Sequence, residues 1–236
     1  MGILSVFTTM NPRLTIKKLI GHSNNLLTFY LGTVRKYAML DPMIFSEDVC
    51  TSNGSDVAAE GFKILRSTLY YGVVQDIANI VFDNGKSNPS IINIHSMLES
   101  GKVVEHLRKN YVTEYVDEED LIEVYKERAE ARGKEFDGHM KELSELIESL
   151  KSNTEVRSTK AIRDKFTAHI DLQYINGTYE YPDISKYGLQ WGSLRKILSD
   201  IKPVIERIGF VVRDAGFDWE SFEQQNLRIS KGYWGR

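Results

Sequence analysis

Apolar side chains recur at helical spacing over most of the chain, and the breaks between these runs mark where the predicted helices end. The first run predicts a helix that begins near residue 23 or 24, where Ser-Asn offers an N-cap. The helix should end before Pro42, because proline disfavours helical geometry in the residue before it. Residues 1–22 contain the helix breakers Pro12 and Gly21 and are predicted to be irregular.

The next part of the chain predicts a linker and two more helices. Residues 46–55 are polar and predict the linker. A wide apolar face predicts a long helix over residues 56–82, and Asp83-Asn84-Gly85 is a strong signal for its end. A third helix is expected over residues 89–115, with an interruption near Gly101.

Charged residues dominate the segment that follows. Residues 117–150 predict two helices with a break between them at Gly133 and Gly138. Acidic residues come first and basic residues later in the first of these helices, an order that complements the helix dipole. We interpret the charges as a solvated surface. A further helix is predicted over residues 152–170.

The last part of the chain predicts a change of structure before the final helix. Residues 174–181 predict a short β-hairpin, since Asn176-Gly177 lies between aromatic and β-branched residues. A long helix is expected over residues 191–215, kinked at Pro203. The tail, residues 216–236, carries aromatic side chains that should dock on the body. The chain is therefore predicted to be all-α: one antiparallel helical bundle with a hairpin inserted near residues 174–181.

Composition narrows the class of protein without identifying a substrate. The 236 residues are 42% hydrophobic and 27% charged, as expected for one globular domain over residues 1–236. The net charge of −3 is unlike that of proteins that coat nucleic acid, although a local basic patch suffices for an enzyme that contacts a few nucleotides. The single cysteine, Cys50, excludes an internal disulfide and fits a cytoplasmic location. We expect no membrane span and no signal peptide.

The segment that carries candidate chemistry is the helix predicted over residues 152–170. It contains Arg163 and, six positions later, His169. Histidine can act as acid or base near neutral pH, because its ordinary pKa is about 6.5. Arginine is permanently charged and presents a planar fork that fits phosphate oxygens. Together they suit metal-free cleavage of RNA, with Asp164 orienting Arg163 or a catalytic proton.

Spacing alone leaves a second interpretation open. Ile162, Phe166 and His169 fall on one face of a helix, so His169 borders an apolar face and could be a core histidine with one hydrogen bond. In an α-helix, six positions also place Arg163 and His169 about 120° apart and about 9 Å apart in rise. One helix therefore cannot assemble the two side chains into a site.

A family resemblance favours the catalytic interpretation. The string Arg-Asp-Lys-Phe-Thr-Ala-His (163–169) resembles the Arg-x(4–6)-His motif of HEPN domains. RDKFTAHID is especially similar to the AbiU2-like branch, whose members carry an Arg-Asn/Asp-Lys run followed by Ala-His-Asp. Asp83 and the Ser-Asn-Pro-Ser segment that follows also look like a junction in that branch. The similarity covers about residues 24–213.

The resemblance implies a homodimer with a composite site and an endoribonuclease, in phage defence by abortive infection or as the toxin of a toxin–antitoxin pair. It assigns Arg163 to the phosphate and His169 to acid or base catalysis, with Asp164 as support. Lys165 and Arg66 are candidates for RNA contact. No metal site and no cofactor are expected, and an antitoxin protein is a possible partner. A catalytically inactive domain that binds RNA, nucleotides or protein is the alternative, since Asp164 replaces the commoner asparagine. A helical scaffold without a site is a third interpretation.

Overall fold

A computed structural model describes residues 12–52, 56–113, 122–167, 173–175, 178–180 and 184–235, and most of these residues are helical. The α-helices are α1 (Pro12–Phe45), α2 (Glu47–Ser52), α3 (Asp56–Phe82), α4 (Ile91–Leu98), α5 (Gly101–Val112), α6 (Ile122–Ser152), α7 (Thr154–Ile162), α8 (Ser193–Arg213) and α9 (Trp219–Trp234). A π-helical turn, η2 (Arg163–Thr167), continues α7, and a 3₁₀ turn, η3 (Ile184–Tyr187), comes before α8. The fold is an all-α bundle, as the sequence predicts.

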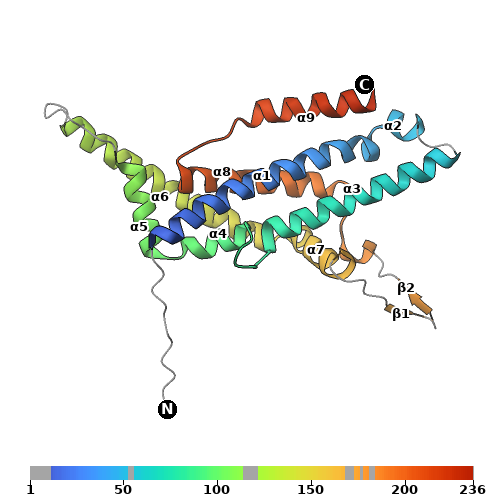
Figure 1. The fold of residues 1–236 in the computed structure, drawn as a ribbon, viewed down its shortest axis with the longest axis horizontal. Coiled ribbons are helices and arrows are strands. Elements are labelled where there is room, and N and C mark those ends of the chain that lie inside the picture. The colour runs from blue at the N-terminus through green and yellow to red at the C-terminus, as the bar shows by residue number, and fades with distance from the viewer. Residues whose placement is uncertain are drawn as a thin grey trace, which may run out of the picture.

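The bundle is built on two long helices, α1 and α3, which lie side by side along the molecule (Figure 1). Helix α8 packs antiparallel to α1: Arg195 near its start bonds Asp41, and Arg213 at its end donates to Ser23. Helices α6, α5 and α4 cover one end, and α7 packs against α3. Most of these helices contribute to one apolar core, in which Leu26 is fully buried.

Helix α1 is longer at both ends than the sequence predicts. It begins at Pro12, within the segment expected to be irregular, because proline is well tolerated in the first turn of a helix. Gly21 costs only about 1 kcal/mol within a helix, and the burial of Ile16 and Leu19 beside it offsets that cost.

The prediction that the helix ends before Pro42 is also wrong, and α9 explains why. A proline at position 42 has no N–H to donate to the carbonyl of Ala38, four residues earlier. The hydroxyl of Ser230 on α9 donates to that carbonyl instead, at 2.8 Å. The indole Nε1 of Trp234 donates to the next carbonyl, that of Met39, at 3.2 Å. The continuation of α1 past Pro42 is therefore supported by a helix from the other end of the chain.

Three further differences concern the charged segment, the linker and the tail. The two helices expected within residues 117–150 are one helix, α6, which passes through Gly133 and Gly138. The polar linker contains α2, whose first turn is acidic and whose Val49 is buried. The tail forms α9, with Asp218 as its N-cap. Its aromatic residues dock on the body as expected, since the ring of Trp219 lies edge-on to Tyr30 at 5.9 Å.

Two short strands lie where the sequence predicts a hairpin. Strands β1 (Gln173–Ile175) and β2 (Thr178–Glu180) pair antiparallel, with Tyr174 opposite Tyr179. They lie beyond α7 at the edge of the helical body (Figure 1). The turn at residues 176–177 lies outside the described residues, so its type stays a prediction.

None of the helices that the structure describes combines the length and the apolar character needed to span a lipid bilayer.

Candidate functional site

The motif segment changes its helical geometry where the motif begins. The side chain of Asn153 caps α7 by accepting from the N–H groups of Glu155 and Val156, at 2.9 and 3.3 Å. Helix α7 then passes into the π-helical turn η2 at Arg163. Turns of this kind are rare in proteins, and a large share of those that exist lie at functional sites. Because a π turn is wider than an α turn, the angle of about 120° predicted between the motif side chains does not apply to this segment.

Arg163 is held by a neighbour in sequence and by a second helix. Its Nε and Nη2 atoms both donate to Oδ1 of Asp164, at 2.9 and 2.8 Å. Its Nη1 atom donates to Oδ1 of Asn79 on α3, at 3.1 Å. The side chain of Arg163 is only 17% exposed, whereas that of Asp164 is 48% exposed. The guanidinium is therefore fixed in direction at the end of α3, which is what an electrostatic role would require.

The charge of Arg163 acts on a polar turn that follows α3. Partial burial by itself raises the pKa of the Asp83 carboxyl, but hydrogen bonds from Asn88 and from the Gly85 N–H, together with the positive charge of Arg163, lower that pKa below its ordinary value. The two hydrogen bonds measure 2.8 and 3.0 Å. Asp83 is therefore an anion held close to the motif arginine.

The same turn starts α4 and is closely packed. Ser90 donates to the Asp83 carbonyl and caps α4 by accepting from the Asn93 N–H. The amide of Asn93 donates to the carbonyls of Gly85 and Asn88, at 2.8 and 2.9 Å. A Cβ at Gly85 would lie 2.6 Å from the Asn88 amide nitrogen, so the position has no room for a side chain. The stop signal and the Asp83 junction seen in the sequence thus form one structured turn.

A basic pocket of about 420 Å³ lies beside the motif. Its apolar lining residues include Phe82 at the end of α3 and Ile92 on α4. Its charged lining residues are Lys151, Arg157, Lys160 and Asp164. Lys151 also forms an ion pair with Glu148 at 2.7 Å, so Arg157 and Lys160 are the cations that make this pocket suited to an anion such as a phosphate group.

The basic pocket was not predicted from the sequence, although part of its signal was present. Arg157, Lys160 and Asp164 follow one another at intervals of three and four residues, which places them on one face of a helix. Lys151, by contrast, lies at the end of α6 and joins the pocket only through the fold. The ammonium group of Lys160 lies 5.9 Å from the centre of the Phe82 ring.

The other predicted site residues have different positions. Lys165 is exposed on η2. Arg66 does not contact Arg163: its guanidinium lies 5.9 Å from the ring centre of Phe62 and 5.2 Å from that of Trp191. His169 lies outside the described residues, so its placement stays a prediction. The segments that the structure describes contain no group of three or more histidine, cysteine or acidic side chains placed to hold a metal ion.

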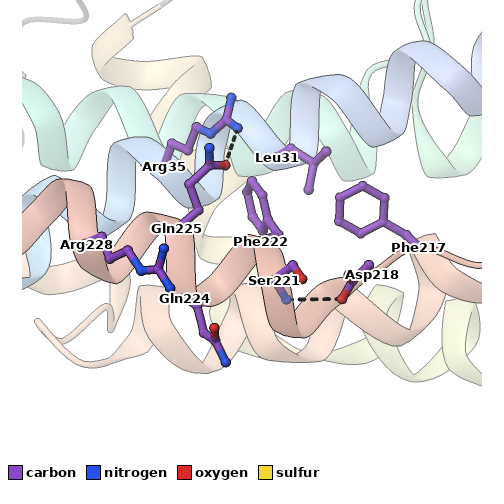
Figure 2. A pocket seen from close by; sticks show the side chains of 9 residues that line it. All are labelled: Leu31, Arg35, Phe217, Asp218, Ser221, Phe222, Gln224, Gln225 and Arg228. Carbon is purple, nitrogen blue, oxygen red and sulfur yellow. Dashed lines mark hydrogen bonds between the residues drawn. The ribbon is translucent and has the colours of Figure 1, made fainter.

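A different pocket, of about 550 Å³, lies between α1 and α9 (Figure 2). Some of its polar groups bond to one another: Arg35 donates to Gln225 at 3.2 Å, and the Ser221 N–H donates to Asp218 at 3.1 Å. Arg35 also lies 5.2 Å from the centre of the Phe222 ring. These contacts explain how α9 is held on α1 and suggest no chemistry.

Comparison with known families assigns the chain to a protein family. The model of the HEPN family described as AbiU2 matches residues 16–233. The chain belongs to the AbiU2 family of HEPN domains. The match is longer at both ends than the resemblance over residues 24–213, and it includes most of α1 and of α9. No curated protein and no solved structure gives a significant match.

Membership of this family relates the motif to a class of proteins. The AbiU2 name places this protein among HEPN domains related to abortive infection. The described part of its motif, Arg163 to Thr167, lies against α3 and beside the basic pocket. In this AbiU2 protein a fixed arginine, a nearby hydrogen-bonded turn and a cationic pocket therefore occur together at the junction of α3, α4 and α7.

Proposed function

We propose that this AbiU2 protein is a metal-independent endoribonuclease that acts in phage defence by abortive infection or as the toxin of a toxin–antitoxin pair. One observation carries the proposal: the guanidinium of Arg163 is fixed beside a basic pocket, and a histidine follows it at the motif spacing. An arginine held in this way offers fixed positive charge to a phosphate without reorganisation during the reaction.

In the proposed reaction, the 2′-hydroxyl of one nucleotide attacks the adjacent phosphorus atom and loses its proton to a base. The bond from phosphorus to the 5′-oxygen breaks, and that oxygen takes up a proton from an acid. His169 serves as the base or the acid, and Arg163 stabilises the negative charge on the phosphate oxygens. Asp164 positions Arg163 through their two hydrogen bonds. The products are a 2′,3′-cyclic phosphate and a 5′-hydroxyl.

The basic pocket supports an RNA substrate. In this proposal Arg157 and Lys160, with Lys151 beside them in the pocket, bind phosphates next to the scissile one. Lys165, exposed on the π turn, adds charge on the same segment. The net charge of −3 thus conceals a local cationic surface, which is sufficient for an enzyme that holds a few nucleotides.

The complete site requires a second copy of the chain. A homodimer that brings two motif segments together across a two-fold axis would place an arginine and a histidine from each chain in one cleft. A separate antitoxin protein would block that cleft in the toxin setting. In this proposal the whole chain acts as one domain.

An experiment with total cellular RNA tests the proposal. Purified protein is incubated with the RNA in the presence of EDTA, and the ends of any fragments are determined. We expect cleavage that EDTA does not affect, and fragments that carry 2′,3′-cyclic phosphate and 5′-hydroxyl ends. RNA that is bound but left intact under all conditions would instead favour the alternative, a binding module without catalysis.

A further inference from the structure

A third pocket, of about 590 Å³, lies at the middle of α3, where the segment before α8 packs against it. Aromatic side chains form much of its wall, and groups that can form hydrogen bonds lie between them. The lining residues are Ser67, Tyr70, Tyr71, Leu189, Gln190, Trp191 and Gly192. None of them belongs to the motif or to the basic pocket.

Trp191 offers an open ring surface in this pocket. Its side chain is still 48% exposed, although two neighbours contact it. The ring of Tyr70 lies edge-on at 5.0 Å, and the guanidinium of Arg66 lies 5.2 Å from the ring centre. A large aromatic ring that is held by its neighbours and remains accessible is a platform on which a flat ligand can stack.

Arg66, beside Trp191, brings a positive charge near the pocket, and no carboxylate of the described residues pairs with it. Within the described segments, Arg66 forms no ion pair, and its Nε atom is buried without a hydrogen-bond partner. Eleven other arginine and lysine residues of these segments do pair with acidic side chains, as Lys36 does with Asp76 at 2.5 Å. An arginine without such a partner attracts an anionic group, and its planar fork suits a phosphate.

We propose that this pocket binds a nucleobase of single-stranded RNA, with the base stacked on Trp191 and the adjoining phosphate near Arg66. Proteins that bind single-stranded nucleic acids commonly combine an aromatic ring, on which a base stacks, with a cation near the phosphate. That the ligand is RNA rests on the proposed function, the cleavage of RNA. It adds a subsite that holds the RNA at a distance from the bond that is cut.

Residues of α3 contribute to both sites. Tyr70 in the pocket and Asn79, the partner of Arg163, are nine residues apart. Nine residues of α-helix rise about 13 Å and turn about 180°, so a strand that joins the two sites would pass around α3 as well as along it. The subsite would therefore fix which base lies several positions from the scissile phosphate.

Binding of a non-cleavable RNA tests the subsite separately from catalysis. The probe is a fluorescein-labelled 2′-O-methyl RNA of mixed sequence, whose blocked hydroxyl cannot attack phosphorus, and its Kd is measured by anisotropy. Trp191→Ala should raise the Kd about 5- to 150-fold, because one stacked base is lost. Trp191→Phe keeps a ring and should lose much less. Arg66→Gln should weaken binding and reduce its dependence on salt.

Phe45→Ala is the matched control. Phe45 is also 48% exposed, and Arg195 lies 4.6 Å from its ring centre, but it lies outside the pocket. The Kd of the Phe45→Ala variant for the RNA probe should equal that of the wild type. Equal binding by Trp191→Ala, or equal loss in Trp191→Ala and Phe45→Ala, would overturn the proposal. So would a Trp191→Ala variant that becomes monomeric by sedimentation while the wild type is a dimer, since the pocket would then be covered by a second copy.

Binding of mononucleotides shows whether the base and phosphate that the pocket holds belong to RNA or to a free nucleotide. Tight binding of a free nucleoside monophosphate without binding of the RNA would overturn the RNA subsite. Wild-type protein that binds the probe through Trp191 but cuts no natural RNA would support the subsite while the proposed cleavage fails. Cleavage of natural RNA with the same KM in the wild type and in Trp191→Ala would overturn the subsite and leave the cleavage proposal intact.

Discussion

Arg163 links the motif to the body of the protein through contacts with two different helical segments. Asp164 takes two of its hydrogen bonds and Asn79 a third, and its charge reaches Asp83 at the end of α3. A long side chain with this many restraints has already lost the freedom that binding would otherwise remove. The residue is therefore preorganised for contact with a phosphate.

The environment of Asp83 predicts a dependence of stability on pH. Its pKa is lowered in the folded protein, so the ionised carboxyl stabilises the fold above the ordinary carboxyl pKa of about 3.9, and this contribution is lost as the pH falls through the lowered value. Urea unfolding of the wild type and of Asp83→Asn should show a larger difference in the free energy of unfolding at pH 7 than at pH 3. A difference that does not change with pH would contradict the assigned interactions.

The sequence predicts part of the site at this scale. The motif identifies Arg163 and Asp164, and their hydrogen bonds follow from their adjacency. The contact with Asn79 could not be predicted, because helical periodicity assumes α geometry and the segment is a π turn with no evident signal in the residue types. Lys151 reaches the basic pocket through the packing of α6 and α7, which spacing along one helix does not contain.

Two elements, α1 and α9, depend on each other. Helix α1 continues through Pro42 where the Ser230 hydroxyl bonds the carbonyl that the proline leaves open. Ser230→Ala should lower the free energy of unfolding by about 1–3 kcal/mol, the effect of an unsatisfied buried carbonyl. Ser144→Ala is the control, since the exposed Ser144 hydroxyl only bonds Met140 in its own helix. Equal effects of the two substitutions in urea unfolding would argue against the role of Ser230.

The close packing of the turn between α3 and α4 predicts that alanine at Gly85 and alanine at Gly138 change the stability of the protein in opposite directions. A methyl group at Gly85 would meet the Asn88 amide at 2.6 Å, so Gly85→Ala should destabilise the protein by about 1–3 kcal/mol. Gly138 lies within α6 with open space around it, and Gly138→Ala should stabilise the protein by about 0.5–1 kcal/mol. Thermal unfolding of both variants checks these signs, and a neutral Gly85→Ala would show that the turn can relax.

The elements that the sequence predicts well are those whose apolar face alone determines their length. Helix α3 has the predicted bounds, Asp56–Phe82, because a wide apolar run ends at a clear stop signal. Several of the wrong predictions share a cause, because a helix breaker in the sequence does not end a helix that is stabilised by packing. Pro12, Gly133 and Pro42 lie within helices that tertiary contacts stabilise, and such contacts are absent from local patterns.

At the scale of the whole molecule, the proposed site requires a homodimer. Sedimentation velocity at micromolar concentration should give a species with twice the mass of the chain, and cleavage should fall faster than linearly as the protein is diluted below the dissociation constant of the dimer. Mixing the wild type with an excess of an inactive Arg163→Ala chain should lower activity per wild-type chain, because mixed dimers contain an incomplete site. A monomer that cleaves RNA with full activity would exclude the composite site.

RNA cleavage by four matched proteins tests the central claim most directly. The wild type, Arg163→Ala, His169→Ala and the double variant are compared with EDTA present, after circular dichroism has shown equal folding. Each single substitution should abolish cleavage, and the double variant should be no worse than either, because groups that act as one unit are not additive. Cleavage by the His169→Ala variant at the rate of the wild type would contradict the assignment of this AbiU2 protein as an endoribonuclease that acts through Arg163 and His169.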